Sequence, residues 1–159
     1  MKKIEYKNLN TTEKKLLSTA QDAALLSISK DGHKVGAALI DENNKVHSGT
    51  TIGRTRIVGS VCAEQMALDN MLYMGNKIQK KIVIIGKLNE YKENMICPPC
   101  GRCREMFAEI LQETGIYDIT FIISSWNKKN IIKTSIKELL PLAFSIKKDR
   151  NYEDSGNKK

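Results

Sequence analysis

Apolar residues in the first third of the chain recur first at helical spacing and then at strand spacing. Asn10 followed by Glu13 resembles a capping box, in which each side chain accepts a hydrogen bond from the other residue's backbone. A helix is expected to follow, because apolar residues repeat on one helical face: Leu16, Leu17, Ala20, Ala23, Ala24 and Ile28. We expect this helix to end near Asp31-Gly32. Residues 35–40 and 45–52 flank the turn-forming pair Asn43-Asn44 and predict a β-hairpin.

The rest of the chain alternates predicted helices and strands. Helices are predicted from Cys62 to Met74, stopped at Gly75, from about Cys100 after Pro99, and over residues 136–140. Short strands are predicted over residues 82–85, 119–124 and 131–134. This order predicts one three-layer α/β domain around a mixed sheet, over residues 1–146, with a charged, disordered tail over residues 147–159.

The composition narrows the class of protein. An apolar fraction of 41% and a charged fraction of 28% are ordinary for a globular protein, and no apolar run reaches the ~20 residues of a membrane span. The first residues lack the apolar stretch of a secretory signal, so we expect a cytoplasmic protein without a membrane partner. The net charge of +8 is mostly scattered lysine, which favours a solvated surface over a nucleic-acid site.

The four cysteines are expected to be metal ligands or buried thiols, because disulfides are rare in a reducing compartment. Cys100 and Cys103 lie one helical turn apart at a helix start, so both thiols can reach one ion. Cys62 starts the predicted helix that follows the hairpin. Its thiol points to the same end of the molecule as those of Cys100 and Cys103 if this helix packs beside the helix that begins near Cys100. Three thiolates leave a fourth tetrahedral position open, which is typical of a catalytic zinc site. Cys97 and Cys100 have the same spacing as Cys100 and Cys103, so they could also be a pair of metal ligands. The position of Pro99 favours Cys100 and Cys103 as the ligands, with Cys97 as a buried loop thiol.

Glu64 follows Cys62 at the distance that suits a proton carrier beside a metal site, and it is poorly placed to be a further ligand. Taken alone, a cysteine, an alanine and a glutamate at a helix start are more often a buried thiol, a spacer and an acid that offsets the helix dipole. Joined to Pro99-Cys100-Gly101-Arg102-Cys103, however, Cys62-Ala63-Glu64 matches the signature of the zinc-dependent deaminases of nucleosides and nucleobases.

Segments in four places resemble the small cytidine deaminases and their blasticidin-S deaminase branch. They are residues 35–39 (VGAAL), 62–64 (CAE), 99–104 (PCGRCR) and 139–144 (LLPLAF). This resemblance implies a mixed five-stranded sheet flanked by helices, one zinc ion per chain, and a homotetramer, with a homodimer as the alternative. It also implies hydrolysis of the 4-amino group of a cytosine nucleoside, with release of ammonia. The rival hypotheses are a cytosine deaminase acting on RNA or single-stranded DNA, and a zinc-binding assembly module without activity.

The resemblance also suggests roles for residues around the metal. Arg102 is expected to offset the thiolate charge, because Gln65 stands where many cytidine deaminases have an arginine. The backbone groups around Ala63 and Cys100 are expected to orient the amino group. His33 is expected to stack on the base, unless it is an ordinary surface histidine. Phe144 is expected to reach a neighbouring subunit's pocket, unless it fills the core of its own subunit.

The segment before the first zinc cysteine departs from the family pattern. Ordinary cytidine deaminases hold the ribose with an Asn-x-Glu pair, and Thr51 and Gly53 stand at those positions here. Arg54 and Arg56 follow, and arginine suits carboxylate or phosphate, so we expect a cytosine ligand with an anionic group on or near its sugar. The alternative is that both arginines point into solvent and plain cytidine binds weakly through its base.

Overall fold

The computed structural model describes residues 1–88 and 93–143, which form a mixed six-stranded sheet in the order β1-β6-β5-β4-β2-β3. The parallel pair is β4 with β5, and the other neighbours are antiparallel. The strands are β1 (Lys2–Ile4), β2 (Lys34–Asp41), β3 (Val46–Thr50), β4 (Ile78–Lys87), β5 (Thr120–Ser125) and β6 (Ile131–Ser135). The predicted mixed sheet is therefore confirmed, with one more strand than the resemblance implied.

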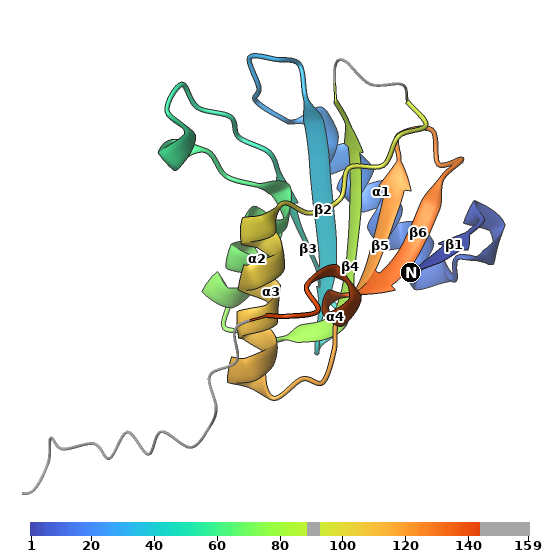
Figure 1. Cartoon of the computed structure of the whole chain (residues 1–159), viewed down its shortest axis with the longest axis vertical. Helices are drawn as coiled ribbons and strands as arrows, with labels where there is room; N and C mark the ends of the chain where they lie inside the picture. Colours follow the sequence, from blue (N-terminus) through green and yellow to red (C-terminus); the bar gives the residue numbers. More distant parts are fainter. Residues whose placement is uncertain (89–92, 144–159) are drawn as a thin grey trace, which may run out of the picture.

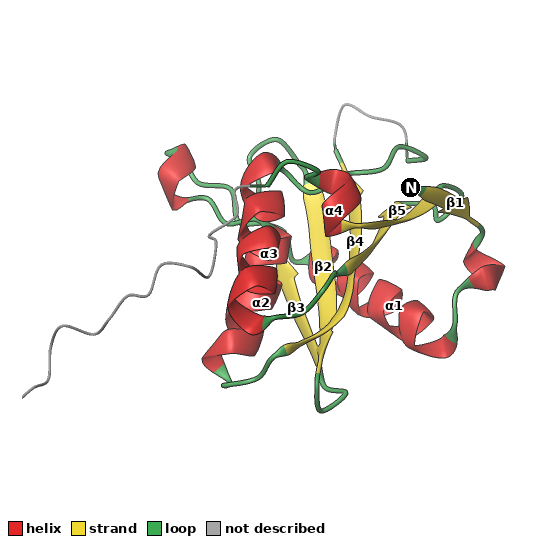
Figure 2. Cartoon of the chain, turned by 60° about the horizontal axis from the view of Figure 1, so that its bottom comes forward, coloured by secondary structure: helices red, strands yellow, loops and turns green. Residues whose placement is uncertain are grey.

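Helices cover both faces of the sheet, which gives the predicted three layers (Figure 1 and Figure 2). On one face lies α1 (Thr11–Leu25), and on the other lie α2 (Ala63–Tyr73), α3 (Gly101–Thr114) and the short α4 (Ile136–Leu139). Alternation along the strands explains the two cores, since Ala37 and Leu39 of β2 face α2 and α3 whereas Ala38 and Ile40 face α1. Two short 3-10 helices span Tyr6–Asn8 and Ile57–Gly59.

The start of α1 agrees with the prediction, and its end does not. The capping box between Asn10 and Glu13 is formed in both directions. The helix ends at Leu25 rather than near Asp31-Gly32, because the following residues bond to the sheet instead of continuing the helical ladder. The Ile28 N–H donates to the Thr51 carbonyl at 3.0 Å, so Ile28 belongs to a bridge with the hairpin rather than to the helix.

One strand is longer than predicted, and another lies where no strand is predicted. The short strand predicted over residues 82–85 is the central part of the longer β4, whose pairing with β2 runs from Ile78 to Lys87. The extra strand β1 pairs with β6 at the edge of the sheet. Its three residues include two lysines and show no alternation, so the sequence pattern offers no signal for a strand.

The packing of α2 against β3 brings the amino ends of α2 and α3 to the same end of the sheet (Figure 1). A Cβ atom at Gly49 in β3 would lie 2.3 Å from the Ala63 carbonyl oxygen and 2.4 Å from the Ala67 nitrogen. Only a glycine permits so close an approach of strand and helix. None of the helices described here combines the length and apolar character needed to cross a bilayer.

Candidate metal and active site

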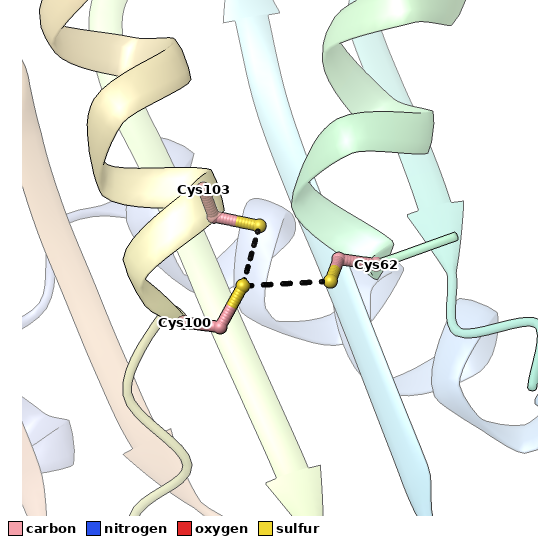
Figure 3. A group of neighbouring side chains, drawn as sticks. All are labelled: Cys62, Cys100 and Cys103. Carbon is pink, nitrogen blue, oxygen red and sulfur yellow. Dashed lines mark hydrogen bonds between the residues drawn. The ribbon is translucent and has the colours of Figure 1, made fainter. Parts of the chain in front are cut away.

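Three thiols meet where α2 and α3 begin. Cys62 is the N-cap of α2, Cys100 is the N-cap of α3, and Cys103 lies in the first turn of α3. Neither N-cap side chain bonds to its own helix backbone, so the thiols are free to face one another (Figure 3). The helix amino ends carry partial positive charge, which stabilises thiolates at this place.

The spacing of the three sulfurs matches a tetrahedral metal site. The Cys62 and Cys100 Sγ atoms are 3.7 Å apart, and those of Cys100 and Cys103 are 3.5 Å apart. All three sulfurs lie within 4.8 Å of one another. Tetrahedral thiolates with Zn–S bonds of ~2.3 Å stand about 3.8 Å apart, so the protein already holds its sulfurs close to the positions that zinc requires.

Proton sharing among the thiols also favours a cation. Hydrogen bonding with Cys103 lowers the pKa of Cys62 to about 6, and the positive charge of Arg102 acts in the same direction. The same contact with Cys62 raises the pKa of Cys103. One thiol therefore loses its proton easily while its neighbour resists a second negative charge. A divalent cation would remove this conflict, because it stabilises all the thiolates together.

Glu64 lies in the first turn of α2, next to the thiols, with only 4% of its surface exposed. Burial raises the pKa of its carboxyl to about 7, and the neighbouring Cys62 adds to the effect. A carboxyl with a pKa near neutrality can both accept and donate a proton, whereas a bound cation nearby would shift the pKa downward. The position of Glu64 therefore suits proton transfer within a closed site.

Cys62 and Cys100 of the thiol cluster line a cavity of about 210 Å³ together with Glu64. This volume is less than the ~300–1,000 Å³ of pockets that hold drug-sized ligands, so it suits a small ligand or one small part of a larger ligand. Its lining consists of Val35, Thr51, Cys62, Glu64, Leu88, Ile96, Cys97, Pro98 and Cys100. Two larger hollows, between α3 and α4 and beside β1 and β6, contain no cluster of potential metal ligands among the described residues.

The remaining candidate residues fall into three groups. Thr51 lines the cavity, whereas Ala63, the first residue of α2, is fully buried and does not line it. His33 is half-buried just before β2 and does not line the cavity, while Arg54, Arg56 and Arg102 are exposed. Phe144 lies outside the described residues.

The sequence analysis assigned no role to two residues that shape the site but take no part in the proposed reaction. Arg104 in α3 donates from Nε to the Pro99 carbonyl at 2.9 Å and from Nη1 to the Leu139 carbonyl, so it ties the loop before α3 to α4. Cys97 lies outside the thiol cluster but lines the cavity. No pattern in the sequence marks either role, because both depend on contacts between distant segments.

The chain is similar to known deaminases in both sequence and fold. The family described as "Cytidine and deoxycytidylate deaminase zinc-binding region" matches residues 10–122. The chain is 26% identical to blasticidin-S deaminase from Bacillus cereus, over 87% of this chain and 96% of that protein. It is 29% identical to cytidine deaminase from Sporosarcina psychrophila, over 84% and 88% of the two chains. The crystal structure of cytidine deaminase from Burkholderia pseudomallei superposes with a TM-score of 0.70 and 25% identity, covering 86% of this chain and all of that one.

Proposed function

The chain belongs to the family of cytidine and deoxycytidylate deaminases with a zinc-binding region. From this membership we propose that the chain deaminates a small cytosine nucleoside. The reaction would use zinc held by the three clustered cysteines. In this reaction water adds to C4 of the ring, the bond from C4 to the exocyclic nitrogen breaks, and ammonia leaves a 4-oxo ring. A cluster of three thiols, two of which line one cavity together with a buried carboxyl, carries the proposal.

Zinc is the cofactor that the family and the donor set indicate. Cys62, Cys100 and Cys103 would hold one ion, since their sulfurs already stand at the separation of tetrahedral thiolates. Bound there, zinc would supply the Lewis acidity that activates water near neutral pH. A zinc ion with three thiolates carries a net negative charge, and Arg102, which already lowers the pKa of Cys62, offsets part of it.

Glu64 moves the protons. Its carboxyl takes a proton from the attacking water, delivers one to N3 of the ring, and later protonates the departing amine. Burial supports this role, because proton transfer inside the cavity avoids exchange with bulk water. A structural zinc site would not need a buried carboxyl beside it, which disfavours the assembly-module hypothesis.

The sugar side of the substrate is proposed to carry an anionic group. Glu64 is the one carboxylate among the described residues that line the cavity, and Thr51 is the one hydroxyl. The loop that follows Thr51 exposes Arg54 and Arg56 and returns to Cys62, so both cations stand close in sequence to the cavity wall. Similarity to a blasticidin-S deaminase supports a ligand whose sugar carries a carboxylate, and a cytidine nucleotide has similar chemistry.

Comparison of kcat/KM for cytidine, deoxycytidine, cytidylate and blasticidin S tests this substrate class. We expect an anionic ligand to rank first, and Arg54→Ala or Arg56→Ala to reduce that preference. A ranking led by cytidine that neither substitution alters would reject the anionic group and leave the zinc chemistry in place.

The active form is proposed to be a homotetramer in which Phe144 packs on substrate in a neighbouring subunit's pocket. Activity should then fall when the assembly is diluted to monomers, as followed by light scattering and ammonia release together. A fully active monomer would contradict the proposal. A steep loss of binding with added salt would instead indicate a polynucleotide substrate.

A further inference from the structure

One wall of the cavity is lined by Val35 of β2, by Leu88, which directly follows β4, and by residues 96–98. Residues 96–98 belong to the loop that crosses the sheet before α3 (Figure 1). Val35 in β2 pairs directly with Gly86 in β4. Ile96 forms a bridge to Ser125 at the end of β5, which holds the loop against the sheet. Cys97, the next residue, is thereby placed against β4 with one side toward the cavity, and 9% of its surface is exposed.

Gly86 leaves room for Cys97, and little more. A Cβ atom at position 86 would lie 2.8 Å from both Cβ and Sγ of Cys97 and 3.2 Å from Cγ2 of Val35. Ordinary contacts between such atoms are ~3.5–4.0 Å, so a side chain at position 86 would have to displace its neighbours. Val35 is held in the β2 ladder, and its carbonyl accepts hydrogen bonds from Ser27 and Thr51. The space open to a displaced Cys97 is therefore the cavity.

We propose that Cys97 is a specificity-determining residue and that Gly86 is its positioning residue. Together they set the depth of the cavity that holds the cytosine ring, and this depth limits the substituents accepted at C5. This inference rests on the proposed function, because it assigns the cavity to the ring. C5 is adjacent to the reacting C4, so a substituent there enters the same small cavity as the ring. One additional methyl group in a close-fitting apolar pocket changes kcat/KM by ~10–200-fold, which is ample for selection.

An exchange of side-chain atoms between the two positions tests the proposal. We expect Gly86→Ala to lower kcat/KM for cytidine about tenfold, mainly through KM, because Cys97 is pushed into the cavity. Cys97→Gly should raise the ratio of 5-methylcytidine to cytidine turnover about tenfold. The double variant Gly86→Ala/Cys97→Gly should restore KM to near the wild-type value. Gly101→Ala is the matched control, because nothing lies within 4 Å of a Cβ at that exposed position.

Two further measurements keep the outcomes separate. Zinc content and melting temperature, measured on each variant, identify a loss of activity that is caused by misfolding. If Gly86→Ala misfolds, Cys97→Leu narrows the cavity at the same wall and should give the same rise in KM. The rate at which a small methanethiosulfonate labels Cys97, followed by mass spectrometry, should rise in Gly86→Ala whether or not the protein is a deaminase. No turnover of any cytosine nucleoside by the wild type would reject the proposed function alone. An unchanged KM and labelling rate in Gly86→Ala, or a double variant that keeps the full loss, would overturn the wall assignment.

Discussion

Replacing Gly49 by alanine should damage the active site from a position that touches no reacting group. The added Cβ would overlap the Ala63 carbonyl oxygen at 2.3 Å and the Ala67 nitrogen at 2.4 Å, both in the backbone of α2. Ordinary contact is ~3.5 Å, so strand and helix must separate by about 1 Å. The displaced helix carries Cys62 at its N-cap and Glu64 in its first turn, so both move away from Cys100 and Cys103.

The expected magnitude follows from that displacement. A 1 Å error in the placement of catalytic groups costs on the order of 10²-fold in rate, and we expect this loss in kcat/KM for the preferred substrate. Overpacking of a close helix–strand contact costs about 1–3 kcal/mol in unfolding free energy. For a chain of this size that corresponds to a fall of ~2–12 °C in melting temperature.

Gly101→Ala is the matched control for this experiment. The same methyl group is added directly beside Cys100, but it meets no atom within 4 Å. Kinetics, zinc content and melting temperature should stay near those of the wild type in Gly101→Ala and fall together in Gly49→Ala. Equal activity and stability of the two variants would refute the reasoning that the contact between β3 and α2 positions the site.

Three further predictions concern the metal, its charge and the fold. Elemental analysis should find full zinc in Cys97→Ser and loss in serine variants of the three clustered cysteines, and the reverse pattern for Cys97 and Cys103 would overturn the ligand choice. Arg102→Gln should raise the pH at which activity develops, because less positive charge then opposes the thiolates, while an unchanged pH profile would remove Arg102 from charge compensation. Glu13→Gln should cost about 1–3 kcal/mol at pH 7 in urea unfolding, since the nearly buried carboxylate accepts hydrogen bonds from Lys81 at 2.9 Å and Lys133 at 3.0 Å. Burial raises the pKa of Glu13, but these bonds and the Asn10 N–H lower it overall. The stability advantage of the wild type over Glu13→Gln is therefore fully present above about pH 4.3 and shrinks as the pH falls further. A stability advantage that grows in acid would contradict the assignment.

Local signals in the sequence predicted most of the candidate site. The capping box at Asn10 and Glu13 depends on residues three apart, and the structure contains it in full. The Cys62-Ala63-Glu64 and Pro99-Cys100-Gly101-Arg102-Cys103 segments each fix their own geometry at a helix start, and the structure brings Cys62, Cys100 and Cys103 together. Predictions based on short-range geometry therefore transferred well to the fold.

Features that depend on contacts between distant segments could not be predicted in this way. The edge strand β1 exists because β6 offers an unpaired edge, and its own residues carry no strand pattern. The early end of α1 depends on hydrogen bonds to the hairpin, which periodicity does not encode. The wall formed by Gly86 and Cys97 depends on the register of β4 with β2 and on the path of a loop. The sequence predicts Cys97 only as a buried loop thiol, which is confirmed, and gives no sign of what the thiol packs against.

The most direct test of the account is the zinc content and turnover of Glu64→Gln beside the wild type. We expect one zinc ion per chain in both proteins and ammonia release from a cytosine nucleoside by the wild type. In the variant we expect kcat to fall by at least ~10²–10⁴-fold. This result would place Glu64 in proton transfer and separate that role from metal binding. Zinc-loaded Glu64→Gln with near-normal turnover, or a zinc-loaded wild type that releases no ammonia from any cytosine nucleoside, would contradict it.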